Sequence, residues 1–294
     1  MEHHMSESLF TMIRLEKAGH ISFFAIPRVG TDEKAMLFIH GMAGFKDYLV
    51  PQMEYFASRG IMCFAPDIMG HGERNNIDVS GKSILDYVDD VSDYADTVVR
   101  SETTAHIVLV GHSMGGLIAA KLAEKRSDVS AAVLITPAPP RGVALYPGGL
   151  VSFTLGDVSS LAKKMVGHGT FIPSRKFLES LFVDPKASKS VIDQWEQKRV
   201  SEESTLVARQ LGLSLLAVDE RKIAAPMLVI GAKKDKIVHH RVARSAARYY
   251  GADYHLIGSL GHMCLFESGH EEVSQVMSAW LVQKSIYTIT TPQE

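Results

Sequence analysis

The chain has 294 residues, of which 46% are hydrophobic and 22% charged, proportions that exclude a collagen-like, coiled-coil or disordered protein. Lys and Arg number 31 and Asp and Glu 33, for a formal net charge of −2, so the chain lacks the basic character expected of a nucleic-acid-binding protein. The length is consistent with one large domain that carries an insertion.

The ends and the cysteines bear on localisation. Residues 1–10 lack the basic start and apolar run of a secretion signal, and no stretch contains the roughly 18 apolar residues that a membrane helix needs. Cys63 and Cys264 are too few for a disulfide framework or a four-ligand zinc site. We interpret them as reduced thiols and predict a cytoplasmic protein with no stable membrane insertion.

Short apolar runs alternate with helical stretches along the chain. Runs of about four apolar residues, closed by Gly, Pro or His, are typical of parallel strands buried on both faces of a sheet. The order predicts an α/β fold built from βαβ units. The runs are residues 36–39, 62–65, 107–110, 132–135 and 227–230.

Residues 83–100 have the clearest helical period. Apolar side chains recur at steps of three and four residues, and aspartates lie opposite them. An acidic cluster can bind a metal ion, but these carboxylates fall on the side predicted to face solvent, so we interpret them as a solvated surface. They are Asp86, Asp89, Asp90, Asp93 and Asp96.

The strand pattern stops at Pro137 and resumes at Pro226. Prolines and glycines interrupt the chain after Pro137, and helical patches follow. We predict that residues 1–136 and 216–294 form the α/β core and that residues 137–215 form a helical insertion between two strands of the same sheet. Four cations of the insertion form either a solvated surface or a basic rim for an anionic substrate: Lys163, Lys164, Arg175 and Lys176.

A G-x-S-x-G motif lies between a predicted strand and a predicted helix. It comprises Gly111, His112, Ser113, Met114 and Gly115. In this context a sharp turn lifts the serine out of the sheet, and the glycines leave room where a Cβ would collide. We predict that Ser113 is a nucleophile, and we interpret His112 as a packing residue of the turn rather than a second base.

Two stretches upstream carry a family resemblance together with this motif. His40, Gly41, Met42, Ala43 and Gly44 follow the first apolar run, and Asp67, Gly70, His71 and Gly72 follow the second. They resemble the oxyanion loop and the D-x-x-G-H-G stretch of the α/β-hydrolases, and the resemblance extends from about residue 34 to residue 281. It implies a mostly parallel sheet flanked by helices, with a helical cap formed by residues 137–215.

The order nucleophile, acid, histidine in this fold places the other two catalytic residues after the insertion. Asp235 follows the run 227–230 in a loop that resembles the family's acid loop, and His262 lies in a G-H loop with Glu267 shortly after it. The alternative acid position, residues 136–139, holds no carboxylate. We predict Asp235 as the acid and His262 as the base.

The backbone N–H groups of Met42 and Met114 are the predicted oxyanion hole. His40, Gly41, Gly111 and Gly115 are expected to support the loops that carry it. We expect no metal: His239 and His240 are adjacent, and neighbours on a helix do not face one site. No cofactor is expected, because the resemblance implies a hydrolase that works with side chains and water.

The resemblance implies hydrolysis of carboxylic esters through an acyl-enzyme, as in carboxylesterases and monoacylglycerol lipases, on a small to medium apolar acyl ester. Thioesterase, lactonase, carbon–carbon bond hydrolase and cofactor-free haloperoxidase activities would use the same residues, and a non-catalytic receptor of this fold is a further alternative. Ser113 stands where dehalogenases and ordinary epoxide hydrolases carry Asp, which disfavours those activities. The partner expected is a small-molecule ester, and the oligomeric state is left open.

Overall fold

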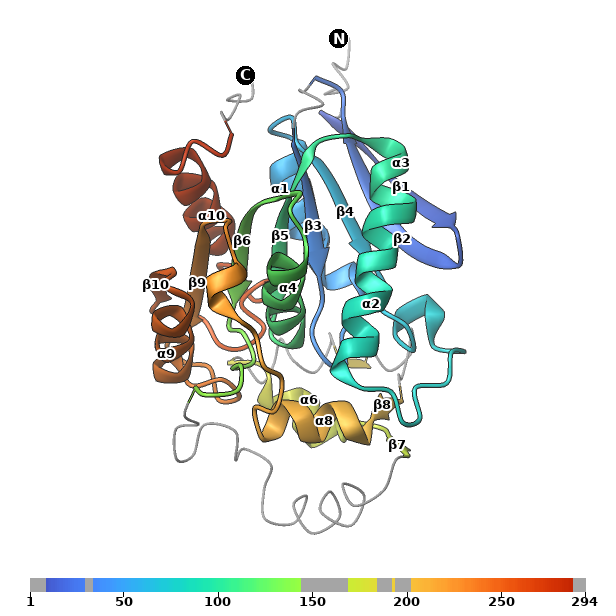
Figure 1. Cartoon of the computed structure of the whole chain (residues 1–294), viewed down its shortest axis with the longest axis vertical. Helices are drawn as coiled ribbons and strands as arrows, with labels where there is room; N and C mark the ends of the chain where they lie inside the picture. Colours follow the sequence, from blue (N-terminus) through green and yellow to red (C-terminus); the bar gives the residue numbers. More distant parts are fainter. Residues whose placement is uncertain (1–8, 30–33, 144–168, 184–191, 194–201, 288–294) are drawn as a thin grey trace, which may run out of the picture.

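A computed structural model describes residues 9–29, 34–143, 169–183, 192–193 and 202–287 (Figure 1). An eight-stranded sheet runs through it, with β2 antiparallel to both of its neighbours and the remaining pairs of the sheet from β4 to β10 parallel. The α/β fold predicted from the apolar runs is confirmed. In spatial order the strands are β1 (Phe10–Lys17), β2 (His20–Pro27), β4 (Met62–Pro66), β3 (Lys34–Ile39), β5 (His106–His112), β6 (Val129–Ile135), β9 (Met227–Ala232) and β10 (Asp253–Ile257).

Helices cover both faces of this sheet (Figure 1). Side chains alternate along β3, so that Leu37 joins the core on one face while Met36 and Phe38 join the core on the other. The first core also contains α2 (Ile84–Tyr94), α4 (Met114–Lys125), α8 (Thr205–Gly212) and α9 (His240–Tyr250), and the second contains α1 (Val50–Ala57) and α10 (Glu271–Gln283). Short 3-10 helices are η1 (Lys46–Leu49), η2 (Gly72–Arg74) and η4 (Glu220–Lys222).

The helix predicted over residues 83–100 is present, with a change of pitch in the middle. Ser83 is its N-cap and forms a capping box with Asp86. After α2 the helix continues through a π-helical turn, η3 (Ala95–Val99), into α3 (Arg100–Glu102). A π turn inserts an extra residue per turn and has no signal in a simple apolar period.

The prediction that all five aspartates of this helix face solvent is wrong for Asp90, which is buried. Its carboxylate forms two 2.8 Å hydrogen bonds with the guanidinium of Arg74 and accepts a third from the Met69 N–H at 2.9 Å. Asp90 lies three residues after buried Tyr87, at the edge of the apolar face. A buried carboxylate requires such partners, and Arg74 supplies the opposite charge.

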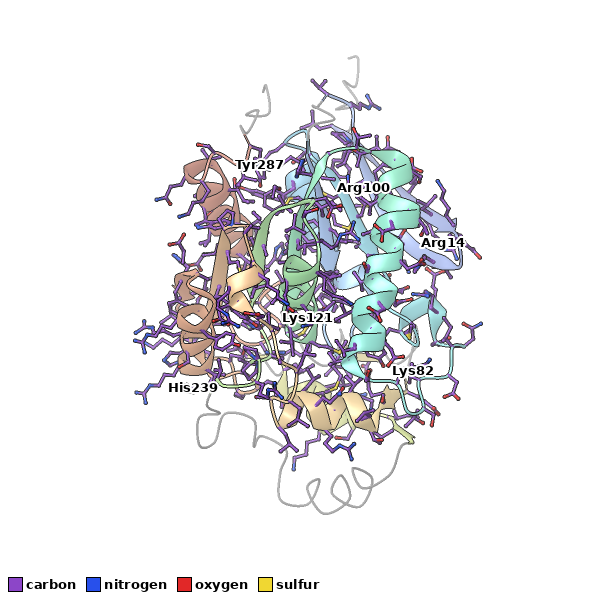
Figure 2. The ribbon with its side chains drawn as sticks, in the orientation of Figure 1. Arg14, Lys82, Arg100, Lys121, His239 and Tyr287 are labelled. Carbon is purple, nitrogen blue, oxygen red and sulfur yellow. The ribbon has the colours of Figure 1, made fainter. Side chains whose placement is uncertain are left out.

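The predicted insertion leaves the sheet after β6 and returns at β9, which are neighbouring parallel strands. The described parts of the insertion lie at one end of the sheet, where the parallel strands end and the helices that follow them begin. Figure 2 shows Lys82 and His239, next to the starts of α2 and α9, at this end, and Figure 1 shows α6 and α8 there as well. Arg100 and Tyr287 lie toward the opposite end. These parts are β7 (Thr170–Phe171), α6 (Arg175–Ser180), β8 (Glu203–Ser204) and α8.

Much of the predicted cap, including Lys163 and Lys164, lies outside the described residues, so its boundaries stay a prediction. Arg175 pairs with Glu179 and Asp193 on the surface. In the described part of the chain, no helix combines the length and the apolar character needed to cross a bilayer.

Replacing Asp90 with alanine should lower the free energy of unfolding by about 3 kcal/mol, because it leaves the Arg74 guanidinium buried without its counter-charge. Urea unfolding followed by circular dichroism measures this change. Asp89→Ala is the matched control, since Asp89 pairs with Lys125 on the surface and should cost no more than about 0.5 kcal/mol. Equal losses in the two variants would contradict the buried pair.

Candidate active site

Ser113 occupies a sharp turn between β5 and α4. Its φ of 54° and ψ of −116° lie in a region that residues with a Cβ rarely adopt. Backbone hydrogen bonds keep it there: its N–H donates to Ile135 O at 2.9 Å, and its carbonyl accepts from Ala138 at 2.9 Å, from Gly116 at 3.0 Å and from Leu117 at 3.4 Å. The turn predicted from the G-x-S-x-G motif thus takes the conformation of a nucleophile elbow.

The two glycines of the motif are required by close backbone contacts. A Cβ on Gly111 would lie 2.1 Å from the carbonyl oxygen of Gly115. A Cβ on Gly115 would lie 2.2 Å from the carbonyl oxygen of Ile39, at the end of the neighbouring strand β3. Since these neighbours are main-chain atoms, they cannot move aside as a flexible side chain could.

The structure brings Ser113, His262 and Asp235 into one hydrogen-bonded series. His262 Nε2 lies 3.0 Å from Ser113 Oγ, and His262 Nδ1 lies 2.8 Å from Asp235 Oδ2. A carboxylate accepts, so Nδ1 carries the imidazole proton and Nε2 is left to accept from the serine hydroxyl. Asp235 is held by the N–H groups of Ile237 at 2.7 Å and Val238 at 2.9 Å on its other oxygen. This arrangement can take a proton from Ser113 as its oxygen attacks an electrophile.

The loop that carries His262 is held by Glu267, which the sequence marked only through the family resemblance. Glu267 accepts from the N–H of Gly261 at 3.0 Å and from the N–H of Val183. The N–H of Met263 donates to Leu181 O at 3.1 Å. Residues 181–183 belong to the predicted insertion, so this segment directly contacts the loop of the candidate base.

His40 orients the loop that follows β3. Its Nε2 accepts from the N–H of Ile68 at 3.0 Å, so Nδ1 carries the proton and donates to Gly41 O at 2.9 Å. Burial and the neighbouring charge of His71 lower the pKa of His40, consistent with this neutral form. Gly44 also donates to Gly41 O, at 3.1 Å. Because the C=O and N–H of a trans peptide point in opposite directions, these two bonds fix the direction of the Met42 N–H.

The predicted oxyanion donors lie next to Ser113 in the chain or in space. Met114 is the first residue of α4, and Gly41 is packed so closely that a Cβ on it would lie 3.0 Å from Ser113 Cβ. Neither the Met42 amide nor the Met114 amide has an acceptor within the part of the chain that the structure describes. The Met114 amide is at a helix start and the Met42 amide is in the loop after β3, and unengaged N–H groups of this kind are suited to hold a negatively charged oxygen.

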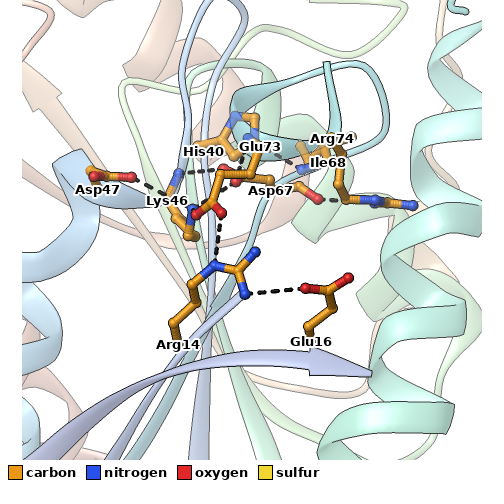
Figure 3. Close-up of polar contacts among 9 residues, drawn as sticks. All are labelled: Arg14, Glu16, His40, Lys46, Asp47, Asp67, Ile68, Glu73 and Arg74. Carbon is orange, nitrogen blue, oxygen red and sulfur yellow. Dashed lines mark hydrogen bonds and ion pairs between the residues drawn. The ribbon is translucent and has the colours of Figure 1, made fainter. Parts of the chain in front are cut away.

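A buried carboxylate connects this loop to the loop after β4 (Figure 3). Asp67 is fully buried; it accepts from Lys46 N at 2.9 Å, from Lys46 Nζ at 2.8 Å and from Glu73 N at 3.0 Å. Burial alone would lower the pKa of Lys46, but the charge of Asp67 and the bonds to Asp67 and Glu73 raise it. Arg14 from β1 completes the cluster by pairing with Glu73 (Figure 3). The D-x-x-G-H-G stretch therefore braces the loop that carries Met42, a predicted oxyanion donor.

Tyr48 and His112 form a second connection, which no motif in the sequence indicates. Gly41 N–H donates to Tyr48 Oη at 2.6 Å, Tyr48 Oη lies 3.0 Å from His112 Nδ1, and His112 Nε2 lies 2.8 Å from His262 O. A carbonyl can only accept, so His112 Nε2 carries the proton and the Tyr48 hydroxyl donates to Nδ1.

Burial and the neighbouring His262 lower the pKa of His112 to about 3, so the imidazole is neutral. Both of its ring nitrogens are engaged, and neither is free to act as a second base. The interpretation of His112 as a packing residue is incomplete, because its side chain, through Tyr48, links the loop after β3 to the loop of His262.

The described residues contain no group of three His, Cys, Asp or Glu side chains placed to hold a metal ion. His239 instead accepts from the N–H of Arg241 at the start of α9. Cys63 and Cys264 are both buried free thiols, and burial raises the pKa of each.

A comparison of the chain with protein-family models gives a match over most of its length. Residues 30–269 match the model described as serine aminopeptidase, S33. The chain belongs to this family. With the eight-stranded sheet and its flanking helices, the match makes the protein an α/β-hydrolase, as the resemblance implied. No curated protein sequence gives a significant match.

Solved structures with the same fold cover nearly the whole chain of this S33-family member. One is a putative lipase from Acinetobacter baumannii, 20% identical with a TM-score of 0.61, covering 95% of this chain and 94% of that one. A carboxyl esterase from Bacillus coagulans is 13% identical with a TM-score of 0.67, covering 93% and 98%. An enol-lactonase from Burkholderia xenovorans is 17% identical with a TM-score of 0.65, covering 92% and 100%. At these identities the likeness shows the fold.

Replacing Tyr48 with phenylalanine should lower the free energy of unfolding by about 1 to 3 kcal/mol, because the Gly41 N–H and His112 Nδ1 lose a buried partner. Chemical unfolding measures the loss. The control is Tyr250→Phe: Tyr250 is also buried, and its hydroxyl has no hydrogen-bond partner among the described residues. A Tyr48 variant as stable as the Tyr250 variant would show that the Tyr48 bridge contributes nothing.

Proposed function

We propose that this α/β-hydrolase is a serine hydrolase that cleaves carboxylic esters through an acyl-enzyme on Ser113. The observation that carries the proposal is the series Ser113 Oγ, His262 Nε2, His262 Nδ1 and Asp235 Oδ2, with separations of 3.0 and 2.8 Å. The support that it receives from backbone amides and buried side chains is typical of a site that keeps one geometry through a reaction.

The chemistry follows from the positions of the protons. Ser113 Oγ attacks the ester carbonyl carbon while its proton passes to His262 Nε2, and Asp235 stabilises the imidazolium that forms. The carbonyl electron pair moves onto oxygen, and this oxyanion accepts hydrogen bonds from the N–H groups of Met42 and Met114 in the oxyanion hole. The intermediate collapses by expelling the alcohol, which takes the proton from His262. Water then repeats the sequence on the acyl-enzyme and releases the acid.

The choice of esters rests on the fold relatives and on the insertion. The solved structures above include a carboxyl esterase and a putative lipase. They also include an enol-lactonase, so cyclic esters are candidate substrates too. We propose that residues 137–215 form a cap that lines the acyl or alcohol pocket for a small to medium apolar ester. Within it, Leu181 and Phe182 are buried beside the loop of His262. Thioesters would react through the same steps.

A fluorophosphonate probe should label the wild-type protein on Ser113, because the activated hydroxyl attacks phosphorus as it attacks a carbonyl. Ser113→Ala should abolish labelling and lower ester turnover by about 10⁴- to 10⁶-fold. Gel fluorescence and peptide mass spectrometry report the site. Ser130→Ala is the control, since Ser130 lies on β6 and its hydroxyl, among the residues that the structure describes, bonds only Ile107 O. Wild-type protein that stays unlabelled would contradict the proposal.

The acyl preference can be measured with p-nitrophenyl esters from acetate to palmitate. We expect kcat/KM to rise with chain length and then fall beyond medium chains, because each buried CH₂ contributes about 0.8 kcal/mol until the pocket is full. A carbon–carbon substrate such as a vinylogous diketone and a thioester should be run in parallel. Labelled protein that cleaves the diketone and no ester would replace esterase with carbon–carbon bond hydrolase.

A further inference from the structure

Glu203 is a buried carboxylate that the reaction does not use. It lies on β8, within the predicted insertion, where it pairs with Phe171 of β7. Its side chain is fully buried, yet it reaches across to the core and accepts from the N–H of Ala43 at 2.9 Å. Its other oxygen lies 3.2 Å from His71 Nε2. Both core residues belong to stretches that carry the family resemblance.

The bond to Ala43 bears on the oxyanion loop because of its place in the chain. The peptide before Met42 is fixed by the two bonds to Gly41 O, from His40 and from Gly44. The peptide after Met42 is fixed by Glu203 through the Ala43 N–H. Ala43 has a φ of 58°, a left-handed conformation unfavourable for a residue with a Cβ. A charged acceptor on its N–H offsets that cost.

His71 is the partner that holds Glu203 in place. Its Nδ1 lies 2.9 Å from Met69 O, which can only accept, so Nδ1 carries a proton. Its Nε2 faces Glu203, and one proton lies between them. Burial alone would lower the pKa of His71, but the charge of Glu203, its hydrogen bond, the bond to Met69 and the charge of Asp67 raise it. The raised pKa favours the imidazolium, in which each ring nitrogen donates to the acceptor that it faces.

The other groups around His71 come from three elements of the core. Asp67 follows β4 and adds to the negative field. The neutral ring of His40, after β3, lies 5.1 Å away between centroids, and the ring of Tyr87 on α2 lies 5.6 Å away edge-on. Glu203 and Asp67 thus face the imidazolium, while His40 and Tyr87 pack against it without charge.

We propose that Glu203, held by the His71 imidazolium, is a positioning residue of the oxyanion hole: through the Ala43 N–H it fixes the Met42 amide, so that the hole depends on a residue of the insertion. This inference rests on the proposed function. Strand β8 of the insertion then helps to position the oxyanion hole, although Glu203 itself does not contact the substrate.

The pairing of Glu203 with His71 should depend on pH. The pKa of His71 is raised above its ordinary value, so the pair is intact below the raised value and is lost as the pH rises through it. The deprotonated Nε2 would then face the carboxylate with its lone pair. In Glu203→Gln the amide oxygen can still accept from Ala43 and the amide N–H₂ can donate to a neutral His71. This variant keeps both contacts of the side chain but removes their dependence on the protonation of His71.

The test is the second-order rate of Ser113 inactivation by a fluorophosphonate between pH 6 and 10. Glu203→Leu should slow inactivation by about 10-fold or more at pH 7, below the roughly 100- to 1000-fold effect of losing a donor outright. Glu203→Gln should react at pH 7 nearly as wild type and lack the alkaline decline of wild type. The matched control is Glu202→Leu, since Glu202 is exposed and, among the described residues, its side chain bonds only Thr170. With an ester, Glu203→Leu should lower kcat and leave KM unchanged.

NMR provides a readout that does not require activity. In the wild-type chain at pH 7, ring ¹⁵N shifts should show His71 protonated on both nitrogens, and in Glu203→Gln on one; His71→Asn assigns the signal. Amide exchange of Ala43 should be protected in wild type and in Glu202→Leu, and fast in Glu203→Leu.

Two results would overturn the inference: Glu203→Leu inactivated at the rate of Glu202→Leu, or a wild-type His71 carrying one ring proton at pH 7. Should Glu203→Leu fail to fold, an alkaline decline in Glu203→Gln equal to that of wild type would equally contradict it. Wild-type protein that does not react with the probe refutes the proposed function instead, and the NMR measurements then decide whether Glu203 holds the loop.

Discussion

The backbone of Ser113 is held at φ 54° and ψ −116°, and the surrounding elements make this conformation possible. Ile135 and Ala138 bond its two main-chain groups, and the missing side chains at Gly111 and Gly115 let β3 and α4 approach. This turn sets where the hydroxyl points and where the first N–H groups of α4 begin. The loops after β3 and β10 then have to be positioned relative to Ser113, and buried hydrogen bonds hold both of them there.

Three buried histidines connect these loops, and each has the protonation state that its neighbours dictate. His40 is neutral, with its proton on Nδ1 toward Gly41 O. His112 is neutral with its proton on Nε2 toward His262 O. His71 faces an acceptor with each of its ring nitrogens, and its raised pKa favours the charged form. A buried charge is costly unless it is paired, and Glu203 supplies the pair while also binding Ala43.

The sequence predicted those parts of the molecule that depend on local pattern. The apolar runs of β3 to β6 and β9 could be identified because buried parallel strands need continuous apolar side chains. The elbow could be located because its glycines are adjacent to the serine in the chain. The hairpin of β1 and β2 was not predicted: the exposure of β1 alternates only in part, and its pairing with β4 through β2 is non-local.

The residues that sequence reasoning missed act over long separations. Asp90 was placed on the solvated face because a helical pattern of apolar residues does not indicate its partner, Arg74, which lies outside the helix. Tyr48 joins Gly41 to His112, 64 positions away, and Glu203 joins Ala43 across 160 positions. Contacts of this kind follow from the packed fold, and one sequence contains no pattern that marks them. The triad candidates were found because the order of the fold and the strand ends restrict where they can lie.

The most direct test of the account is to find the covalent intermediate. The wild-type protein should be mixed with p-nitrophenyl butyrate, quenched with acid during turnover, digested and mapped by mass spectrometry. The account predicts a butyryl group on the peptide that contains Ser113. Ester cleavage with no acyl group on Ser113, or with the group on another residue, would contradict it.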